Sequence, residues 1–227
     1  MGPAPPTGIH EMMLIILQPS YQLGQLESDG TMRYDAEHKQ KTREKVLRAA
    51  TKAIRADGPH RLGVAGVMAK AGLTHGGFYA HFESKDDLIV EAIGLMFDDG
   101  RARMQLETEA REPVAALNAY IDFYLSARHR DAATGCPIPA LAADLPRLSK
   151  PARARFSAGV SRLRGLLAEK LQAAGHPDAA AGASSMLAEL VGALSLARAE
   201  ANPQESDAIL ENSRRSVKAR FGLGVNA

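Results

Sequence analysis

Apolar residues recur at three- and four-residue intervals along most of the chain from residue 36 onward, a spacing typical of amphipathic helices. In the first predicted helix, over residues 36–57, the apolar stripe consists of Val46, Leu47, Ala50 and Ile54. The same pattern predicts further helices over residues 64–70, 75–80, 85–108, 113–128, 151–174, 178–200 and 203–221. No alternating strand pattern of useful length occurs in the sequence, so the predicted fold class is all-α.

Turn and cap residues divide these helices. Gly72 can adopt the positive φ that a tight turn between two short helices needs. Ser84 and Asn202 have the side chains that cap helix N-termini, and they precede the helices predicted from 85 and 203. Residues 134–148 contain three prolines and a glycine, which predicts a loop around one short helical piece.

Composition excludes several classes of protein. The chain has 227 residues, enough for one large or two small domains, and its low aromatic content of 5% favours helices over sheets. The only cysteine, Cys136, excludes an internal disulfide framework and a cysteine-based zinc site. The seven histidines include no i, i+4 pair, so we expect no metal site. We also expect no cofactor and no enzymatic activity, because no catalytic constellation is present.

Charge is distributed unevenly along the chain. Residues 1–32 carry a net charge of −3, residues 33–85 carry +6, and residues 86–227 carry −1. A basic segment followed by a nearly neutral body indicates a module that binds a polyanion, attached to something else.

The N-terminal residues 1–32 are rich in proline, glycine and glutamine, and they contain no lysine or arginine. Two interpretations remain open: a disordered arm, or a start codon assigned too early, with Met32 as the true start. No run approaches the roughly 20 apolar residues that span a bilayer, and no basic region precedes the apolar residues 12–17. We therefore expect a cytoplasmic protein without a membrane partner.

The basic segment contains a specific motif. A helix, a short helix, a glycine turn and another short helix outline a helix-turn-helix. Residues 72–88, GLTHGGFYAHFESKDDL, together with the preceding helix at 43–50, resemble the DNA-binding signature of the TetR family of bacterial repressors. The resemblance implies a three-helix DNA-binding domain over residues 33–84 and a helical effector-binding and dimerisation domain over residues 85–227.

The resemblance also implies roles in binding double-stranded operator DNA, with a palindromic site for a homodimer. Thr74 and His75 would begin the recognition helix, and the missing side chains of Gly76 and Gly77 would let the backbone approach the groove. The remaining contacts would be mainly to phosphates, from Tyr79, His81, Lys85, Lys41 and Arg43. The family usually places Thr or Ser at the start of the second helix, where this chain has Arg61-Leu62-Gly63, so we expect Arg61 to supply that phosphate contact.

The helix over residues 178–200 is apolar on nearly every face between residues 184 and 197. One interpretation is a dimer interface, in which Ala188, Gly192 and Ala193 would allow close packing against a second copy. The alternative is a helix in the centre of the chain's own core. The TetR resemblance implies that the last two helices form the dimer interface.

A pocket for a small effector would be lined by apolar and aromatic residues of the body helices. The candidates are Met96, Phe97, Tyr120, Phe123, Tyr124, Cys136, Phe156 and Met186. Without charged residues at convincing spacing, a mostly apolar effector is expected. Cys136 is either an inert buried thiol or a sensor of electrophiles or oxidants, which would require a lowered pKa.

These observations predict a sequence-specific repressor that a small effector releases from DNA. A thiol-sensing repressor of the same family is the alternative. A structural DNA-binding protein without an effector is a further possibility, and an enzyme on an all-α scaffold lacks the residues it would need.

Overall fold

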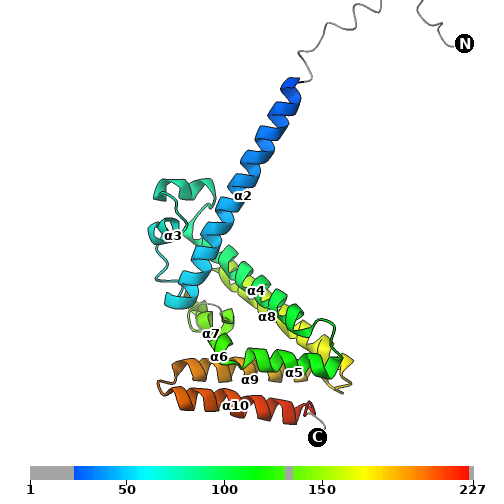
Figure 1. Ribbon diagram of the computed structural model, residues 1–227. Helices are drawn as coiled ribbons and strands as arrows, with labels where there is room; N and C mark the ends of the chain where they lie inside the picture. The colour runs from blue at the N-terminus through cyan, green and yellow to red at the C-terminus, as the bar shows by residue number, and fades with distance from the viewer. Residues whose placement is uncertain (1–22, 131–134, 225–227) are drawn as a thin grey trace, which may run out of the picture. The chain divides into compact units, whose positions relative to one another are not determined.

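The computed structural model describes residues 23–130 and 135–224, with side chains from residue 36 onward. All secondary-structure elements in these ranges are helices (Figure 1). In chain order the elements are α2 (Leu23–Asp57), α3 (Val64–Lys70), η1 (His75–Ala80), α4 (Lys85–Thr108), α5 (Pro113–Tyr124), α6 (Ala127–Arg130), α7 (Pro137–Leu141), η2 (Leu145–Arg147), α8 (Lys150–Ala173), α9 (Ala179–Ala199) and α10 (Pro203–Arg220). The predicted all-α fold class is confirmed for the described residues.

Helix α2 begins at Leu23 and not near residue 36 as predicted. No proline occurs between Pro19 and Pro59, so nothing in the sequence breaks the helix before Gly58, which takes a positive φ of 81°. The chain divides into two compact units, residues 1–44 and 45–227, and α2 contributes to both. Of the predicted arm at residues 1–32, residues 1–22 lie outside the described residues, and residues 23–32 belong to α2.

The second unit has one continuous hydrophobic core, to which the DNA-binding segment and the body helices both contribute. In the body, α8 packs against α4 and α9, and α10 packs against α9 (Figure 1). A close approach between α4 and α8 depends on Gly159, because a Cβ there would lie 2.3 Å from the ring of Phe97. Gly159 therefore permits the aromatic side chain of α4 to lie against the backbone of α8.

The helix predicted over residues 113–128 is broken in the structure. Helix α5 ends at Tyr124, and α6 begins at Ala127. The Ser126 hydroxyl donates to the Phe123 carbonyl at 2.7 Å and accepts from the backbone N–H of His129 at 3.2 Å. Local bonding of a serine to backbone groups competes with the helical pattern, so α5 stops and a new turn starts.

The segment between α6 and α8 contains two short helical pieces, α7 and η2, where one was predicted. Both have proline in the first two positions, where its fixed φ is compatible with a helix start. The predicted bounds of α3, η1 and α4 are confirmed, and those of α8, α9 and α10 are correct to within one residue. The predicted caps are confirmed too, since Ser84 accepts from the Asp87 N–H and Asn202 from the Gln204 N–H.

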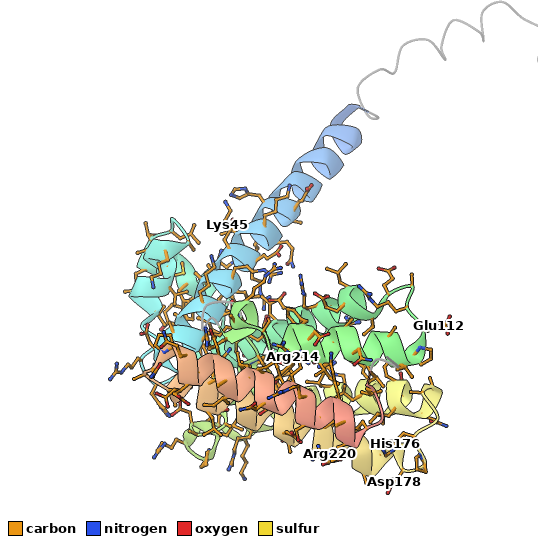
Figure 2. All side chains as sticks on the ribbon, turned by 60° about the horizontal axis from the view of Figure 1, so that its bottom comes forward. Lys45, Glu112, His176, Asp178, Arg214 and Arg220 are labelled. Carbon is orange, nitrogen blue, oxygen red and sulfur yellow. The ribbon has the colours of Figure 1, made fainter. Side chains whose placement is uncertain are left out.

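Ion pairs and hydrogen bonds join α10 to the rest of the body. Arg214 donates to the Leu125 carbonyl at 2.7 Å, and Arg220 pairs with Glu189 of α9. Figure 2 shows Arg214 and Arg220 on α10, and His176 and Asp178 at the turn between α8 and α9, where the Asp178 side chain accepts from the Ala181 N–H. Arg214 thus joins α10 to the end of α5, and Arg220 joins α10 to α9.

By length and composition, α9 is long and apolar enough to cross a membrane, and it is the one such helix among the described residues. The sequence pattern predicted no such segment. Helix α9 packs against α8 and α10 and contributes Met186, Leu190 and Leu194 to the core, so its apolar composition is that of a core helix in a helical bundle.

Candidate DNA-binding surface and effector cavity

Helix α3 and the 3₁₀ helix η1 form the helix-turn-helix. Val67 and Met68 of α3 are buried, and the turn that follows contains Gly72 with φ at 76°. The Leu73 N–H donates to the Met68 carbonyl at 2.9 Å, which closes the turn. On η1, Phe78 is buried and stacks with Phe82 at 5.6 Å between ring centroids. Both phenylalanines hold the motif to the core and do not face outward.

The predicted DNA contacts of this motif lie mainly at the surface. Thr74, His75, Gly76 and Tyr79 are exposed, and the Tyr79 side chain is the most exposed large hydrophobic group, at 72%. Thr74 is the N-cap residue of η1 without a side-chain capping bond. Gly77 and His81 are half-buried. The element is a 3₁₀ helix and not an α-helix, so side chains three positions apart are aligned along its axis.

The basic residues around the motif are placed in different ways. Arg61 is exposed, two residues before Gly63, which is the N-cap residue of α3 and offers no side-chain bond. Lys85 is exposed at the start of α4, and its Nζ donates to the His60 carbonyl at 3.4 Å. Lys41 and the half-buried Arg43 lie on α2 in the other unit, where Lys41 pairs with Glu37 at 2.7 Å.

A cavity of about 250 Å³ lies in the helical body, between α4, α5 and α8 and the segment around α6 and α7. Six of the eight predicted pocket residues line it: Met96, Phe97, Tyr120, Phe123, Tyr124 and Cys136. The other two do not. Phe156 packs edge-on against Phe97 at 5.4 Å, outside the wall, and Met186 is fully buried on α9.

The charged residues of the cavity were not predicted from the sequence. The lining includes five arginines and two aspartates, namely Arg55, Arg101, Arg103, Arg128, Arg162, Asp98 and Asp99. Four of them are neighbours on α4, but Arg55, Arg128 and Arg162 come from α2, α6 and α8, so no local spacing relates the whole set. Only the tertiary packing brings them to one place.

The inner wall combines aromatic rings with polar atoms. Tyr124 is 2% exposed, and its hydroxyl has no nitrogen or oxygen partner among the described residues and interacts with the Cys136 thiol. The Nδ1 of His129 lies 2.7 Å from the Tyr124 carbonyl, which can only accept, so Nδ1 carries the proton and Nε2 is left as an acceptor. Burial lowers the pKa of His129 to about 4, and His129 therefore stays neutral at physiological pH.

The Cys136 thiol is buried in the same wall. Burial raises its pKa above the ordinary value, against the smaller opposing effects of Tyr124, the Ile138 backbone, Arg198 and Arg55. The thiol is consequently protonated at neutral pH, whereas a reactive sensor cysteine needs a thiolate. The lowered pKa that the sensor interpretation requires is not found.

The cavity is bonded to the DNA-binding segment. Arg55, in the last turn of α2, donates from Nε to the carbonyl of Gly135 at 3.1 Å, and both residues line the cavity. About two turns upstream on the same helix, the Nη1 of Arg48 contacts both carboxylate oxygens of Asp99, at 2.6 and 2.7 Å. This is a charge-assisted contact, which is stronger than a hydrogen bond between neutral groups. The helix that begins the DNA-binding segment is thus attached to the cavity wall at two points.

A helix-turn-helix joined to an all-helical body with an internal cavity defines a class of DNA-binding transcriptional regulators. Two family models match the chain. The N-terminal model of the bacterial regulatory proteins of the tetR family matches residues 46–92, and the model of the LmrA/YxaF-like transcriptional regulator C-terminal domain matches residues 113–211. The chain belongs to the TetR family of transcriptional regulators.

Solved structures agree in fold. A TetR transcriptional regulator from Chloroflexus aurantiacus is 26% identical, with a TM-score of 0.72 over 82% of this chain and 96% of that one. Escherichia coli NemR in its reduced form is 21% identical, with a TM-score of 0.69 over 79% and 96% of the two chains. A TetR-family regulator from Agrobacterium tumefaciens is 22% identical, with a TM-score of 0.68 over 78% and 98%. Comparison with curated proteins finds no match in sequence.

The buried, neutral His129 predicts a pH dependence of stability. The unfolded chain takes up a proton near pH 6.5, but the folded chain resists it until about pH 4, so the free energy of unfolding falls as the pH drops through this window. The loss from this one group is about 3 kcal/mol when complete. Urea unfolding between pH 7.5 and 4.5 measures it. His129→Gln should flatten the dependence, and an unchanged profile in that variant would contradict the assignment.

Proposed function

We propose that the protein is a cytoplasmic, homodimeric repressor that binds a palindromic operator and releases it when a small effector enters the cavity. The observation that carries the proposal is the hydrogen bond from Arg55 to Gly135, because it joins a cavity wall directly to the helix that begins the DNA-binding segment. An occupant that displaces the segment around Gly135 or the Arg55 guanidinium changes the position of α2.

Effector and DNA compete through conformation and not through a shared site. A dimer that binds consecutive major grooves needs its recognition helices about 34–36 Å apart. Helix α4 extends from the DNA-binding segment into the cavity wall, since Lys85 begins it and Met96 and Phe97 line the cavity. A ligand that binds more tightly when the two helix-turn-helix motifs of the dimer are not at this spacing weakens DNA binding. The size of the effect is set by the difference in its affinity for the two conformations.

On the DNA side, the phosphate contacts are assigned to Tyr79, His81, Lys85, Arg61, Lys41 and Arg43. Base recognition is assigned to His75, close to the N-terminus of η1, with Thr74 beside it. The exposure of His75 and Tyr79 supports these roles. Lys85 must exchange its bond to the His60 carbonyl for a phosphate, a change that costs little because the lysine ammonium has three donors.

A second copy is expected to pack on α9 and α10. In the single chain, α9 leaves an outward stripe of small and apolar residues that includes Ala188, Gly192 and Leu196, and Leu196 is 63% exposed. A Cβ on Gly192 would meet nothing within 4 Å in its own chain, so the backbone there is open to close approach. The exposure of this apolar stripe in the single chain supports the dimer interpretation.

The thiol-sensing alternative is the weaker one. The charges of Arg55 and Arg198 do lower the pKa of Cys136, but burial outweighs them. Modification of this thiol would therefore require an opening of the cavity wall, and we assign effector binding as the primary signal.

The dimer is tested with Leu196→Arg, which places a charge on the outward stripe of α9. Light scattering at micromolar concentration should give a dimer for the wild type and a monomer for this variant, because a buried unpaired charge is strongly unfavourable. Leu106→Arg is the matched control, since Leu106 is 61% exposed on α4 and belongs to no proposed interface. A monomeric wild type would contradict the dimer.

DNA contacts are tested on an operator duplex selected from a random-sequence pool. Lys85→Ala should weaken binding to most sequences about equally and reduce the slope of log affinity against log salt by about 1. His75→Ala should instead relax the preference at one position in each half-site. Lys170→Ala, in the last turn of α8, should leave the salt slope unchanged. An unchanged slope for Lys85→Ala would refute the phosphate assignment.

The switch is tested by reciprocity. A ligand identified by its thermal stabilisation of the protein should weaken operator affinity by about 5–150-fold, and the operator should weaken ligand affinity by the same factor. Arg55→Lys keeps the positive charge but loses the Nε donor to Gly135, so it should reduce this factor. Equal ligand affinities for free and operator-bound protein would show that the ligand is not an inducer.

A further inference from the structure

The charged residues of the cavity wall are not balanced. Both aspartates are already engaged by arginines that do not line the cavity: Asp99 is bound by Arg48, and Asp98 lies 4.0 Å from Arg155. Of the five lining arginines, Arg103 pairs with Glu107 and Arg55 donates to a carbonyl. The wall therefore keeps a surplus of positive charge after its own acids are accounted for.

Three of these arginines have no ion pair among the described residues. Arg101, Arg128 and Arg162 are exposed, and they come from α4, α6 and α8 respectively. They converge on one cavity from three separate elements, and each is a multiple hydrogen-bond donor that matches a carboxylate geometrically. Their exposure places them at the solvent side of the cavity, whereas Met96, Tyr120 and Cys136 are buried at its inner side.

The inner end is uncharged but not wholly apolar. His129 is neutral at physiological pH, and the buried rings of Phe97, Tyr120 and Tyr124 line the cavity. The buried Tyr124 hydroxyl has no nitrogen or oxygen partner among the described residues and interacts with the Cys136 thiol, whose sulfur is a weak acceptor. A buried donor with so weak an acceptor is costly, and a ligand oxygen at that position reduces the cost.

The volume limits the size of the occupant. A cavity of about 150 Å³ holds benzene, so the roughly 250 Å³ here admits one ring with a short substituent. A large planar polycyclic compound exceeds it.

We propose that the effector is a small aromatic carboxylate, with its ring against the buried aromatic wall near Tyr124 and its carboxylate bound by Arg101, Arg128 and Arg162. This inference rests on the proposed function, because it assigns the chemical class of the effector for the same cavity. It also replaces the mostly apolar effector expected from the sequence with an amphipathic anion.

The test compares acids with their own amides, which have nearly the same shape but no charge. Benzoate, phenylacetate and 3-phenylpropionate are titrated calorimetrically into the full-length protein beside benzamide, phenylacetamide and 3-phenylpropionamide. At least one acid should bind tenfold or more tightly than its amide, because charge-assisted hydrogen bonds are the stronger ones. The proposal is overturned if no acid exceeds its amide.

Variants locate the charge. Arg162→Gln should reduce affinity for the acid by about tenfold and leave the amide unaffected. Arg164→Gln is the matched control, because Arg164 is exposed on the same helix but does not line the cavity. Where one arginine compensates for another, the triple variant Arg101→Gln, Arg128→Gln, Arg162→Gln should abolish the preference for the acid. A triple variant that folds and keeps the preference would overturn the assignment.

Tyr124→Phe tests the inner end. It removes a hydroxyl whose partner among the described residues is the weakly accepting Cys136 thiol, so the thermal midpoint of the ligand-free protein should change little or rise. The same change should weaken binding of a hydroxylated acid such as 4-hydroxybenzoate more than binding of benzoate. If Tyr124→Phe is less stable than the wild type without ligand, the hydroxyl makes a stabilising bond in the ligand-free protein, and its proposed role as a free donor for the ligand is wrong.

The outcomes separate this inference from the proposed function. If an acid binds through the arginines but leaves operator affinity unchanged, the effector-release function is wrong and the ligand class is correct. If only neutral compounds bind and release the operator, the function is correct and the ligand class is wrong.

Discussion

The packing around Gly135 is the constraint on which the site depends. A Cβ at this position would lie 1.6 Å from the guanidinium of Arg198 and 2.7 Å from the His129 carbonyl, so no other residue fits without a rearrangement. Arg198 donates to the carbonyls of His129 and Arg130, and Arg55 donates to the carbonyl of Gly135 itself. One glycine thus lets an arginine of α9 and an arginine of α2 hold the same short segment. The cavity wall, α9 and the DNA-binding segment meet there because the side chain is absent.

Much of the fold follows from local chemistry that the sequence displays. The side chains of Ser84, Ser149, Asp178 and Asn202 cap the starts of α4, α8, α9 and α10, and each acts within one turn. Gly72 and Gly175, both at positive φ, follow the ends of α3 and α8. The break between α5 and α6 escaped prediction because Ser126 and the Arg214 bond to the Leu125 carbonyl decide it, and the second of these is a tertiary contact. The early start of α2 escaped because its extension carries no apolar stripe to predict it.

Part of the cavity wall could also be predicted from the sequence and part could not. Its aromatic residues were predictable, since bulky apolar side chains on body helices are buried somewhere, although Phe156 and Met186 were buried outside the cavity. Its arginines were not predictable, because they are dispersed over residues 55–162 and only the packing of four helices assembles them. The faces of α9 were similarly ambiguous: Leu190 is fully buried and Leu196 is largely exposed, although the sequence around both is apolar.

The pair of glycines in η1 has a consequence for the genome that the regulator serves. Gly76 and Gly77 carry no side-chain atoms that could contact a base edge, so one helix-turn-helix would distinguish few base pairs. Each wrong base pair costs about 1–3 kcal/mol, and a bacterial chromosome offers on the order of a million competing sites or more. Near-matches to a single half-site would therefore be abundant. In the proposed dimer, two helix-turn-helix motifs on one duplex would multiply their discrimination ratios, so the spacing between half-sites would contribute to specificity beside the bases, and insertions or deletions that change this spacing would redirect the regulator.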